Sequence, residues 1–319
     1  MDHLLFDFLS VTEYAAVASM PWVGRGQKNE ADAAATTAMR SRLNALDINA
    51  VVVIGEGELD EAPMLYIGEE VGTKNGPKLD IAVDPLDGTN LIASGQGNSI
   101  SVIAAASRGS LLHAPDMYMK KIAVGRNAAG KINIDAPLLE NMKIVAEANG
   151  KKVSDLTVMV QDRERHKKII KEVQEAGARI CLFSDVDVTC AIATAIEGTG
   201  IDMFVGIGGA PEGVVSAVAL KCLGGELQGQ LLPNNDDEYN RCLKMGISNP
   251  EVSLKMDDLV KSNQCFFSAT GITEGALLRG VRNKNKDKVS THSLFTYGNA
   301  GRAYFIESTH DKVELAEKV

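Results

Sequence analysis

Apolar residues follow two different spacings along the chain, and each spacing predicts a different kind of element. In two early segments, 10–20 and 29–46, apolar positions recur every three or four residues, so both are predicted helices, the second with Asn29 as its expected N-cap. Short β-branched runs bounded by glycine then predict strands at 51–54, 79–83 and 99–106. The first half is therefore expected to combine helices and strands.

From residue 156 onward the predicted strands and helices alternate. The strands are expected at 156–160, 179–183, 201–205 and 226–232, and the helices between them at 163–176, 187–197 and 211–223. This alternation is typical of βαβ units. We place a boundary at the polar stretch 148–151, which predicts an α+β domain over 1–150 and an α/β domain over 151–319, the latter ending in a hairpin around 298–301.

Composition narrows the classes of partner. The chain has 319 residues with 33 basic and 42 acidic side chains, a net charge of -9, which argues against nucleic acid or an anionic membrane as the main partner. An anionic substrate would need a local cation. Five cysteines without a CxxC pair predict neither a disulfide framework nor a thiolate zinc site, and no apolar run approaches the roughly 18 residues of a membrane span. These features favour a cytoplasmic protein.

An acidic turn follows the apolar strand predicted at 79–83. Asp84 and Asp87 flank a proline, and Gly88 and Thr89 follow directly. Paired carboxylates on a rigid turn can share a hard cation such as Mg²⁺, while Gly88 allows close backbone approach and Thr89 offers a hydroxyl at a predicted helix start. The alternative is a plain surface turn, because Asp, Pro and Gly are all turn formers.

Further candidates share this strand-end placement. Glu56, Glu58, Asp60 and Glu61 crowd the loop after 51–54, where a cation would relieve their repulsion, although a solvated acidic loop is the alternative. Asp32 is expected only to help cap its helix.

The second half offers a phosphate cradle and a local source of cations. Gly206, Gly208 and Gly209 precede a helix that begins near Pro211 and Glu212, a predicted strand, glycine loop and helix with backbone N–H groups for a phosphate. Glu212 could instead serve only the helix dipole. The helix predicted at 163–176 opens with Arg163 and Arg165, and Asp185 and Asp187 follow the next strand as candidate partners of sugar hydroxyls or as helix caps.

Five blocks together resemble the class II fructose-1,6-bisphosphatases. They are 55–68, 84–89, 114–119, 208–215 and 267–273, and they stand in that family's order over nearly the whole chain. The Asp-Pro-x-Asp-Gly-Thr core alone is shared across the lithium-sensitive sugar- and inositol-phosphatase superfamily. The resemblance implies an α/β layered sandwich with its active site between a metal-binding domain, 1–150, and a sugar-phosphate-binding domain, 151–319.

The resemblance also implies roles for particular residues. The implied ligands of Mg²⁺ or Mn²⁺ are Asp32, Glu56, Asp84, Asp87 and Glu212. For Asp32, this role replaces the helix-capping role expected above. The implied substrate contacts are Asp87, Gly88, Thr89, Tyr118, Arg163, Glu164, Arg165, Asp185, Val186, Asp187 and Gly209. Relatives commonly have Glu at position 87, Lys-Pro-Arg at 163–165 and Gly at 186, so the chain departs from the family pattern at these places.

The activity implied is hydrolysis of the 1-phosphate of fructose 1,6-bisphosphate, in gluconeogenesis or carbon fixation, by a homotetramer or homodimer. Thr89 would orient or help deprotonate the attacking water, assisted by Glu58 or Asp32. Three alternatives stay open: added activity on sedoheptulose 1,7-bisphosphate, an inositol or nucleotide monophosphatase, and a non-catalytic sugar-phosphate sensor.

Overall fold

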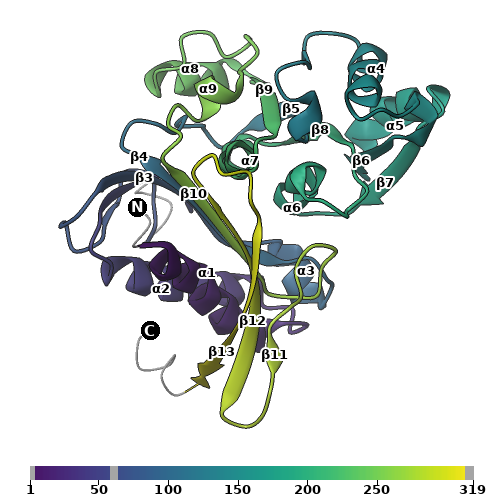
Figure 1. Ribbon diagram of the computed structural model, residues 1–319. Helices are drawn as coiled ribbons and strands as arrows, with labels where there is room; N and C mark the ends of the chain where they lie inside the picture. Colours follow the sequence, from purple (N-terminus) through teal and green to yellow (C-terminus); the bar gives the residue numbers. More distant parts are fainter. Residues whose placement is uncertain (1–3, 58–63, 313–319) are drawn as a thin grey trace. The chain divides into compact units, whose positions relative to one another are not determined.

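The computed structural model describes residues 4–57 and 64–312 (Figure 1). The chain forms two compact units. Unit 1 comprises 1–109, 264–297 and 302–319, and unit 2 comprises 110–263 and 298–301. These units differ from the two consecutive segments expected from the sequence, because the chain returns to the first sheet after residue 263.

Unit 1 is built on a mixed sheet of eight strands in its described part. The strand order is β11-β12-β10-β4-β3-β1-β2, with β13 also paired to β12. Their bounds are β1 Asn49–Ile54, β2 Glu70–Val71, β3 Lys78–Asp87, β4 Ile100–Ser107, β10 Cys265–Gly271, β11 Arg282–Asn283, β12 Lys288–Tyr297 and β13 Tyr304–Asp311. Strands β1 and β3 are parallel, so their carboxyl ends meet at one edge of the sheet.

Two long helices, α1 (Leu5–Ser19) and α2 (Lys28–Asn44), pack on this sheet (Figure 1). Phe8 of α1 lies 4.9 Å, centroid to centroid, from the ring of Phe266, which in turn lies 4.9 Å from that of Phe295. Such aromatic contacts add to the burial of apolar area that holds helix and sheet together. The short helix α3 (Thr89–Ser94) follows β3 directly.

Unit 2 is built on a second mixed sheet, of five strands in the order β7-β6-β8-β5-β9. Its strands are β5 Tyr118–Val124, β6 Thr157–Gln161, β7 Arg179–Phe183, β8 Met203–Gly209 and β9 Glu226–Leu231. Its helices are α4 Leu138–Ala148, α5 Lys167–Glu175, α6 Asp187–Ile192, α7 Ala210–Leu223, α8 Asp236–Lys244 and α9 Met256–Leu259. Strands β6, β7 and β8 are parallel, so 161–165, 183–187 and 209–212 leave the sheet at one edge.

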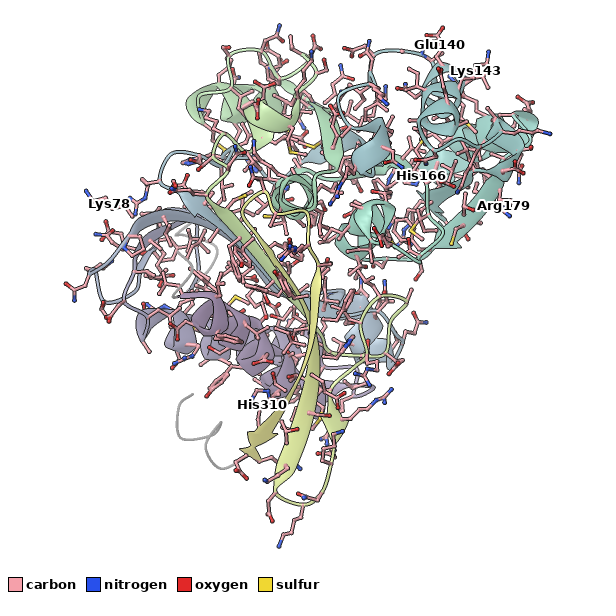
Figure 2. The ribbon with its side chains drawn as sticks, viewed as in Figure 1. Lys78, Glu140, Lys143, His166, Arg179 and His310 are labelled. Atoms are coloured by element: carbon pink, nitrogen blue, oxygen red, sulfur yellow. The ribbon has the colours of Figure 1, made fainter. Side chains whose placement is uncertain are left out.

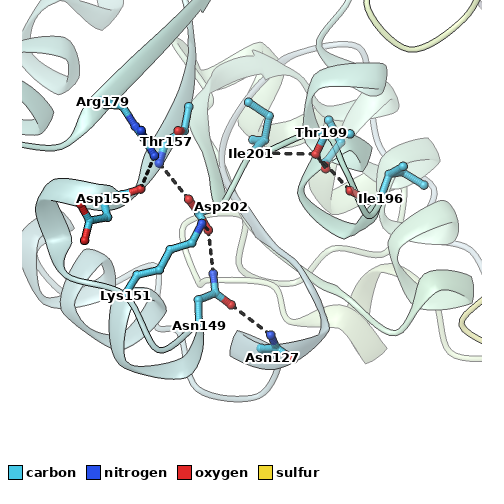
Figure 3. Close-up of polar contacts among 11 residues, drawn as sticks. Asn127, Asn149, Lys151, Asp155, Thr157, Arg179, Ile196, Thr199, Ile201 and Asp202 are labelled. Carbon is cyan, nitrogen blue, oxygen red and sulfur yellow. Dashed lines mark hydrogen bonds and ion pairs between the residues drawn. The ribbon is translucent and has the colours of Figure 1, made fainter.

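The opposite edge of this second sheet is fixed by the buried side chain of Asp202 (Figure 3). Its carboxylate accepts hydrogen bonds from Asn149 Nδ2 at 2.9 Å, Lys151 Nζ at 2.6 Å and the backbone N–H of Thr157 at 2.9 Å. Because Thr157 begins β6 and Asp202 precedes β8, these bonds set how the two parallel strands start.

The predicted α/β class is confirmed, and several local predictions need correction. Helix α2 begins at Lys28 with Gln27 as N-cap, so the prediction of Asn29 as N-cap is wrong. Strand β8 runs through Gly209 into α7 without the predicted glycine loop. The alternation after 156 gives a mixed sheet, because β5 joins β8 and β9 antiparallel.

Two further sequence observations can be set beside the structure. All five cysteines are free thiols. In the described part of the chain, every helix is too short or too polar to cross a bilayer.

Candidate active site

Three carboxylates gather in unit 1 at the edge where β1 and β3 end. We call Asp32, Glu56 and Asp84 the acidic cluster. Glu56 lies just beyond β1, Asp84 lies near the end of the parallel strand β3, and Asp32 comes from α2, which packs on β3. The parallel pairing explains why residues 28 positions apart in sequence come together.

The acidic cluster is electrostatically unfavourable without a cation. Burial, followed by the negative charges of Asp84 and Asp32, raises the pKa of Glu56 to about 9. Burial also raises the pKa of Asp32, and its hydrogen bond with Glu56 opposes that rise. The protonated Glu56 therefore donates to the Asp32 carboxylate. A bound cation would replace this shared proton, since metal ligands bind in their deprotonated form.

The segment between Asp84 and Thr89 is a strand end with a shifted register rather than the predicted open turn. Strand β3 continues to Asp87, and its pairing with β4 shifts between Asp84 and Asp87. Asp84 Oδ1 accepts from the Leu86 N–H at 3.1 Å, which orients the carboxylate. Gly88 then takes φ 93°, a conformation that favours glycine, and Thr89 is the first residue of α3.

The predicted metal ligands are only partly assembled. Within 4–57 and 64–312, no group of three or more His, Cys, Asp or Glu side chains is arranged to hold a metal ion. Asp87 Oδ2 is buried beside the end of β3. Glu212 lies in the first turn of α7 in unit 2. Its inclusion in the metal set stays a prediction, as does the role of Glu58, which lies outside the described residues together with Asp60 and Glu61.

Unit 2 contains a buried cation that the sequence analysis missed. Lys121, in β5, is 1% exposed, and its Nζ lies 2.5 Å from Asp187 Oδ2 and 2.9 Å from the carbonyl oxygen of Gly209. We call Lys121, Asp187, Gly209 and Glu212 the lysine cluster. Lys121 is the second of two adjacent lysines in a strand that is otherwise apolar over 119–124, and because neighbouring strand residues face opposite sides, one of the two could be expected to face the interior.

Lys121 compensates the charge of its neighbours. Burial raises the pKa of Glu212, the positive charge of Lys121 opposes that rise, and Asp187 adds to it. The carboxylate of Glu212 folds back over Gly209, where an added Cβ would collide with it. Glu212 Oε2 is buried and, among the described residues, accepts no hydrogen bond. The glycine therefore makes room for the Glu212 carboxylate.

Two arginines at the same edge of the second sheet differ in how firmly they are held. Arg165 Nε donates to the carbonyl of Ile207 at 2.9 Å, its Nη2 donates to Gln161 at 2.8 Å, and its guanidinium lies 5.0 Å from the Tyr118 ring centroid. Arg163 Nη2 lies 3.6 Å from Asp185 Oδ2 in a half-exposed pair. Glu164 instead pairs with Lys167 at 2.7 Å and is 82% exposed.

Buried His166 (Figure 2) fixes the segment that carries these arginines. Its Nδ1 bonds the carbonyl of Gln161 at 2.9 Å, and its Nε2 accepts the N–H of Ile207 at 2.8 Å. This arrangement requires the neutral ring, and burial lowers the pKa of His166 accordingly. His166 ties the end of β6 to β8 and so positions the neighbouring Arg165.

Val186, where the resemblance implies a glycine, has a backbone conformation that favours glycine. Its φ is 67°, which is strained for a β-branched residue, and its side chain is 2% exposed. The bulk of the side chain is therefore buried in the protein. Asp185 and Asp187 remain on either side of the turn, and Asp187 is the first residue of α6.

The chain is similar to known proteins over most of its length. The family model described as "Bacterial fructose-1,6-bisphosphatase, glpX-encoded" matches residues 2–310. The class 2 fructose-1,6-bisphosphatase of Haemophilus influenzae is 44% identical over 96% of each chain, and fructose-1,6-bisphosphatase 1 class 2 of Escherichia coli K12 is 45% identical over 96% of this chain and 95% of its own. The D-fructose 1,6-bisphosphatase class 2/sedoheptulose 1,7-bisphosphatase of Synechocystis is 43% identical over 98% and 97%.

Solved structures show a weaker likeness. The extragenic suppressor protein SuhB from Bartonella henselae aligns with a TM-score of 0.35 at 13% identity, covering 60% of this chain and 72% of that one. The family model and the curated relatives together define a phosphatase with an α/β fold. The chain belongs to the family of bacterial, glpX-encoded fructose-1,6-bisphosphatases.

Proposed function

We propose that this protein hydrolyses the 1-phosphate of fructose 1,6-bisphosphate to fructose 6-phosphate and inorganic phosphate. Family membership supports the substrate, and one observation carries the chemistry: the half-buried carboxylates of the acidic cluster repel one another near the end of β3, the strand that leads into Thr89. A cluster of this kind is stabilised by a divalent cation, and metal-assisted phosphate transfer needs one.

Asp32, Glu56, Asp84 and Asp87 are the proposed ligands of Mg²⁺ or Mn²⁺ in unit 1, with Glu212 added from the resemblance. Oxygen donors are what these hard ions prefer, and the raised pKa of Glu56 is the sign that the donors lack a counter-charge. When bound, such an ion polarises phosphoryl oxygens and lowers the pKa of water.

The chain's own residues would position the reactants. Thr89 presents its hydroxyl and backbone N–H at the start of α3, and the left-handed Gly88 allows the phosphate to approach the backbone closely. We assign Thr89 to orienting the attacking water and Asp32 or Glu58 to accepting its proton. Phosphoryl transfer depends mainly on such positioning and on charge neutralisation.

Unit 2 would recognise the rest of the substrate. Arg163 and Arg165, with the Tyr118 ring stacked on Arg165, form the cationic and aromatic set suited to the second phosphate. Asp185 and Asp187 are assigned to sugar hydroxyls. A monophosphatase has no need of the second cationic pocket, so these arginines favour a bisphosphate over the inositol or nucleotide monophosphates.

The deciding experiment is phosphate release from a panel of substrates. The panel holds fructose 1,6-bisphosphate, sedoheptulose 1,7-bisphosphate, inositol 1-phosphate and AMP, each with Mg²⁺ or Mn²⁺ and with or without Li⁺. We expect release from the first compound, and from the second as well, given the Synechocystis relative. Binding without release would instead favour a sugar-phosphate sensor.

Thr89→Ala provides the matched test of mechanism. We expect kcat to fall by about 10²–10⁴ with the fold intact, the range typical of a lost proton-transfer or water-orienting group. Thr37→Ala, at a half-buried position of α2 where the hydroxyl donates only to the carbonyl of Ala33, is the control that should leave kcat unchanged. Near-normal turnover of Thr89→Ala would refute the assigned role.

We also infer a homodimer or homotetramer in the cytoplasm, acting in gluconeogenesis or carbon fixation. The family resemblance supports these inferences. Light scattering of the purified chain gives its mass and so tests the oligomer directly.

A further inference from the structure

Lys121 is a charged side chain in the interior of unit 2 that the proposed chemistry does not use. It lies in β5 opposite Gly206 of β8 and Gly229 of β9, and it is 1% exposed. Burying an ammonium group is costly unless an anion and hydrogen-bond acceptors surround it. The buried charge of Lys121 therefore requires specific anionic and hydrogen-bonding partners.

Those partners belong to two separate strand-to-helix turns. Lys121 Nζ donates to Asp187 Oδ2 at 2.5 Å and to the Gly209 carbonyl oxygen at 2.9 Å. Asp187 is the first residue of α6, and Gly209 is the residue immediately before α7. One ammonium group thus fixes the starts of both helices relative to each other.

The glycines of β8 and α7 make room for this arrangement. A Cβ at Gly208 would collide with the Asp187 carboxylate and lie 3.0 Å from Lys121 Nζ, and a Cβ at Gly213 would lie 3.2 Å from Lys121 Cδ. The glycine-rich segment is thus shaped around Lys121 and its partner carboxylate. The same segment was expected from the sequence to be an open phosphate loop.

The turn before Asp187 needs an anchor. Val186 has φ 67°, a conformation that costs a β-branched residue free energy and persists only when the surroundings hold it. The ion pair between Lys121 and Asp187 is one such restraint, since it fixes the residue that directly follows Val186.

We propose that Lys121 is a positioning residue, which holds Asp187 and the Gly209 backbone in the arrangement that binds the sugar phosphate. This inference rests on the proposed function. It predicts that losing the ammonium group weakens substrate binding more than it slows the bound substrate's reaction.

The kinetic test compares two adjacent lysines. In Lys121→Met, we expect KM for fructose 1,6-bisphosphate to rise at least about tenfold while kcat changes less than about threefold. Lys120→Met is the matched control, because Lys120 Nζ donates to the carbonyl of Ile134 at 2.9 Å, away from both turns. Its KM should stay within about twofold of the wild type. Equal KM values for the two variants would overturn the proposal.

A double variant tests whether Lys121 acts through Asp187. Asp187→Asn alone should raise KM, and Lys121→Met/Asp187→Asn should raise it little beyond the larger single effect. The double variant should also melt at a higher temperature than Lys121→Met, because the Asp187 carboxylate is no longer left without its cation. Effects on KM that multiply would show that the two residues act independently, which contradicts the proposal.

Two outcomes separate this inference from the proposed function. If the wild type releases no phosphate from any bisphosphate, the proposed function fails, and calorimetric titration with fructose 6-phosphate then compares binding by Lys121→Met and Lys120→Met. If the wild type is active and Lys121→Met keeps its KM, only the Lys121 inference fails. Should Lys121→Met not fold, the double variant replaces it, with Asp187→Asn alone as its reference.

Discussion

The acidic cluster of unit 1 and the lysine cluster of unit 2 both bring carboxylates close together, but they compensate the negative charge in different ways. Both gather carboxylates at the carboxyl ends of parallel strands, where neighbouring strands bring them together. In unit 2 the chain supplies its own cation, Lys121, at 2.5 Å from Asp187. In unit 1 a proton shared between Glu56 and Asp32 takes that place. This difference supports the proposal that unit 1 binds an external cation.

Removing divalent cations should have the largest effect. After dialysis against EDTA we expect phosphate release from fructose 1,6-bisphosphate to fall by about a thousandfold, the equivalent of several kcal/mol of lost transition-state stabilisation. Adding Mg²⁺ or Mn²⁺ back should restore it, and Na⁺ at matched ionic strength is the control. Hydrolysis that survives chelation would contradict the contrast between the two clusters.

The same chemical change should have opposite effects in the two clusters. Glu56→Gln removes a carboxyl group that the folded protein keeps protonated, so the metal-free protein should gain about 2–3 kcal/mol of unfolding free energy at pH 7. Asp187→Asn leaves Lys121 buried without its ionic partner and should lose about 3–5 kcal/mol. Urea unfolding followed by circular dichroism measures both.

The metal response completes this comparison. Adding Mn²⁺ should stabilise the wild type and Asp187→Asn, and it should stabilise Glu56→Gln far less, since a ligand has been lost. Destabilisation of the metal-free protein by Glu56→Gln would show that the carboxylates of unit 1 do not repel one another as described.

The contribution of Glu56 to the stability of the metal-free protein should fall as the pH rises, which is the reverse of the usual behaviour of a carboxyl group. Because the folded pKa of Glu56, about 9, lies above its ordinary value of 4.5, the folded state holds a proton that the unfolded state has lost between these values. Stability contributed by this group is therefore full below about pH 4.5 and declines by up to about 1.4 kcal/mol per pH unit as the pH rises towards 9.

The proton held by Glu56 can also be detected when metal binds, by calorimetry of Mn²⁺ binding in buffers of different ionisation enthalpy. Binding of Mn²⁺ at pH 7 should release about one proton per chain. The release should disappear in Glu56→Gln, while Lys120→Met serves as the control with unchanged release.

Much of this molecule could be predicted from its sequence, and the failures have physical causes. The short apolar run 180–183 after Gly177 located β7 at its observed bounds, because an apolar run bounded by glycine is a local signal in the sequence. The spacing could not show that the chain returns to the first sheet after residue 263, since strand order depends on long-range pairing.

Some residues of the candidate site have a local signal in the sequence, and others depend on long-range structure. Acidic residues that follow apolar strands marked Glu56 and Asp84, whereas Asp32 gained its role only from the resemblance, because nothing local distinguishes it from a helix-capping acid. Lys121 was missed since a lysine in a strand is ordinarily placed at the surface. Only tertiary structure shows that Asp187 and Gly209 surround it.

The smallest predicted effect compares the two ion pairs at the edge of the second sheet. Arg163 and Asp185 lie 3.6 Å apart with side chains 45% and 33% exposed, whereas Lys121 and Asp187 are 1% and 11% exposed. Solvent screens the first pair, so Arg163→Met should change the unfolding free energy by less than about 0.5 kcal/mol. Because Arg163 is proposed to bind the second phosphate, Arg163→Met should nevertheless raise KM for fructose 1,6-bisphosphate several-fold. Lys168→Met, on the exposed face of α5, is the control for lost surface charge, and equal KM values in these two variants would remove Arg163 from the binding site.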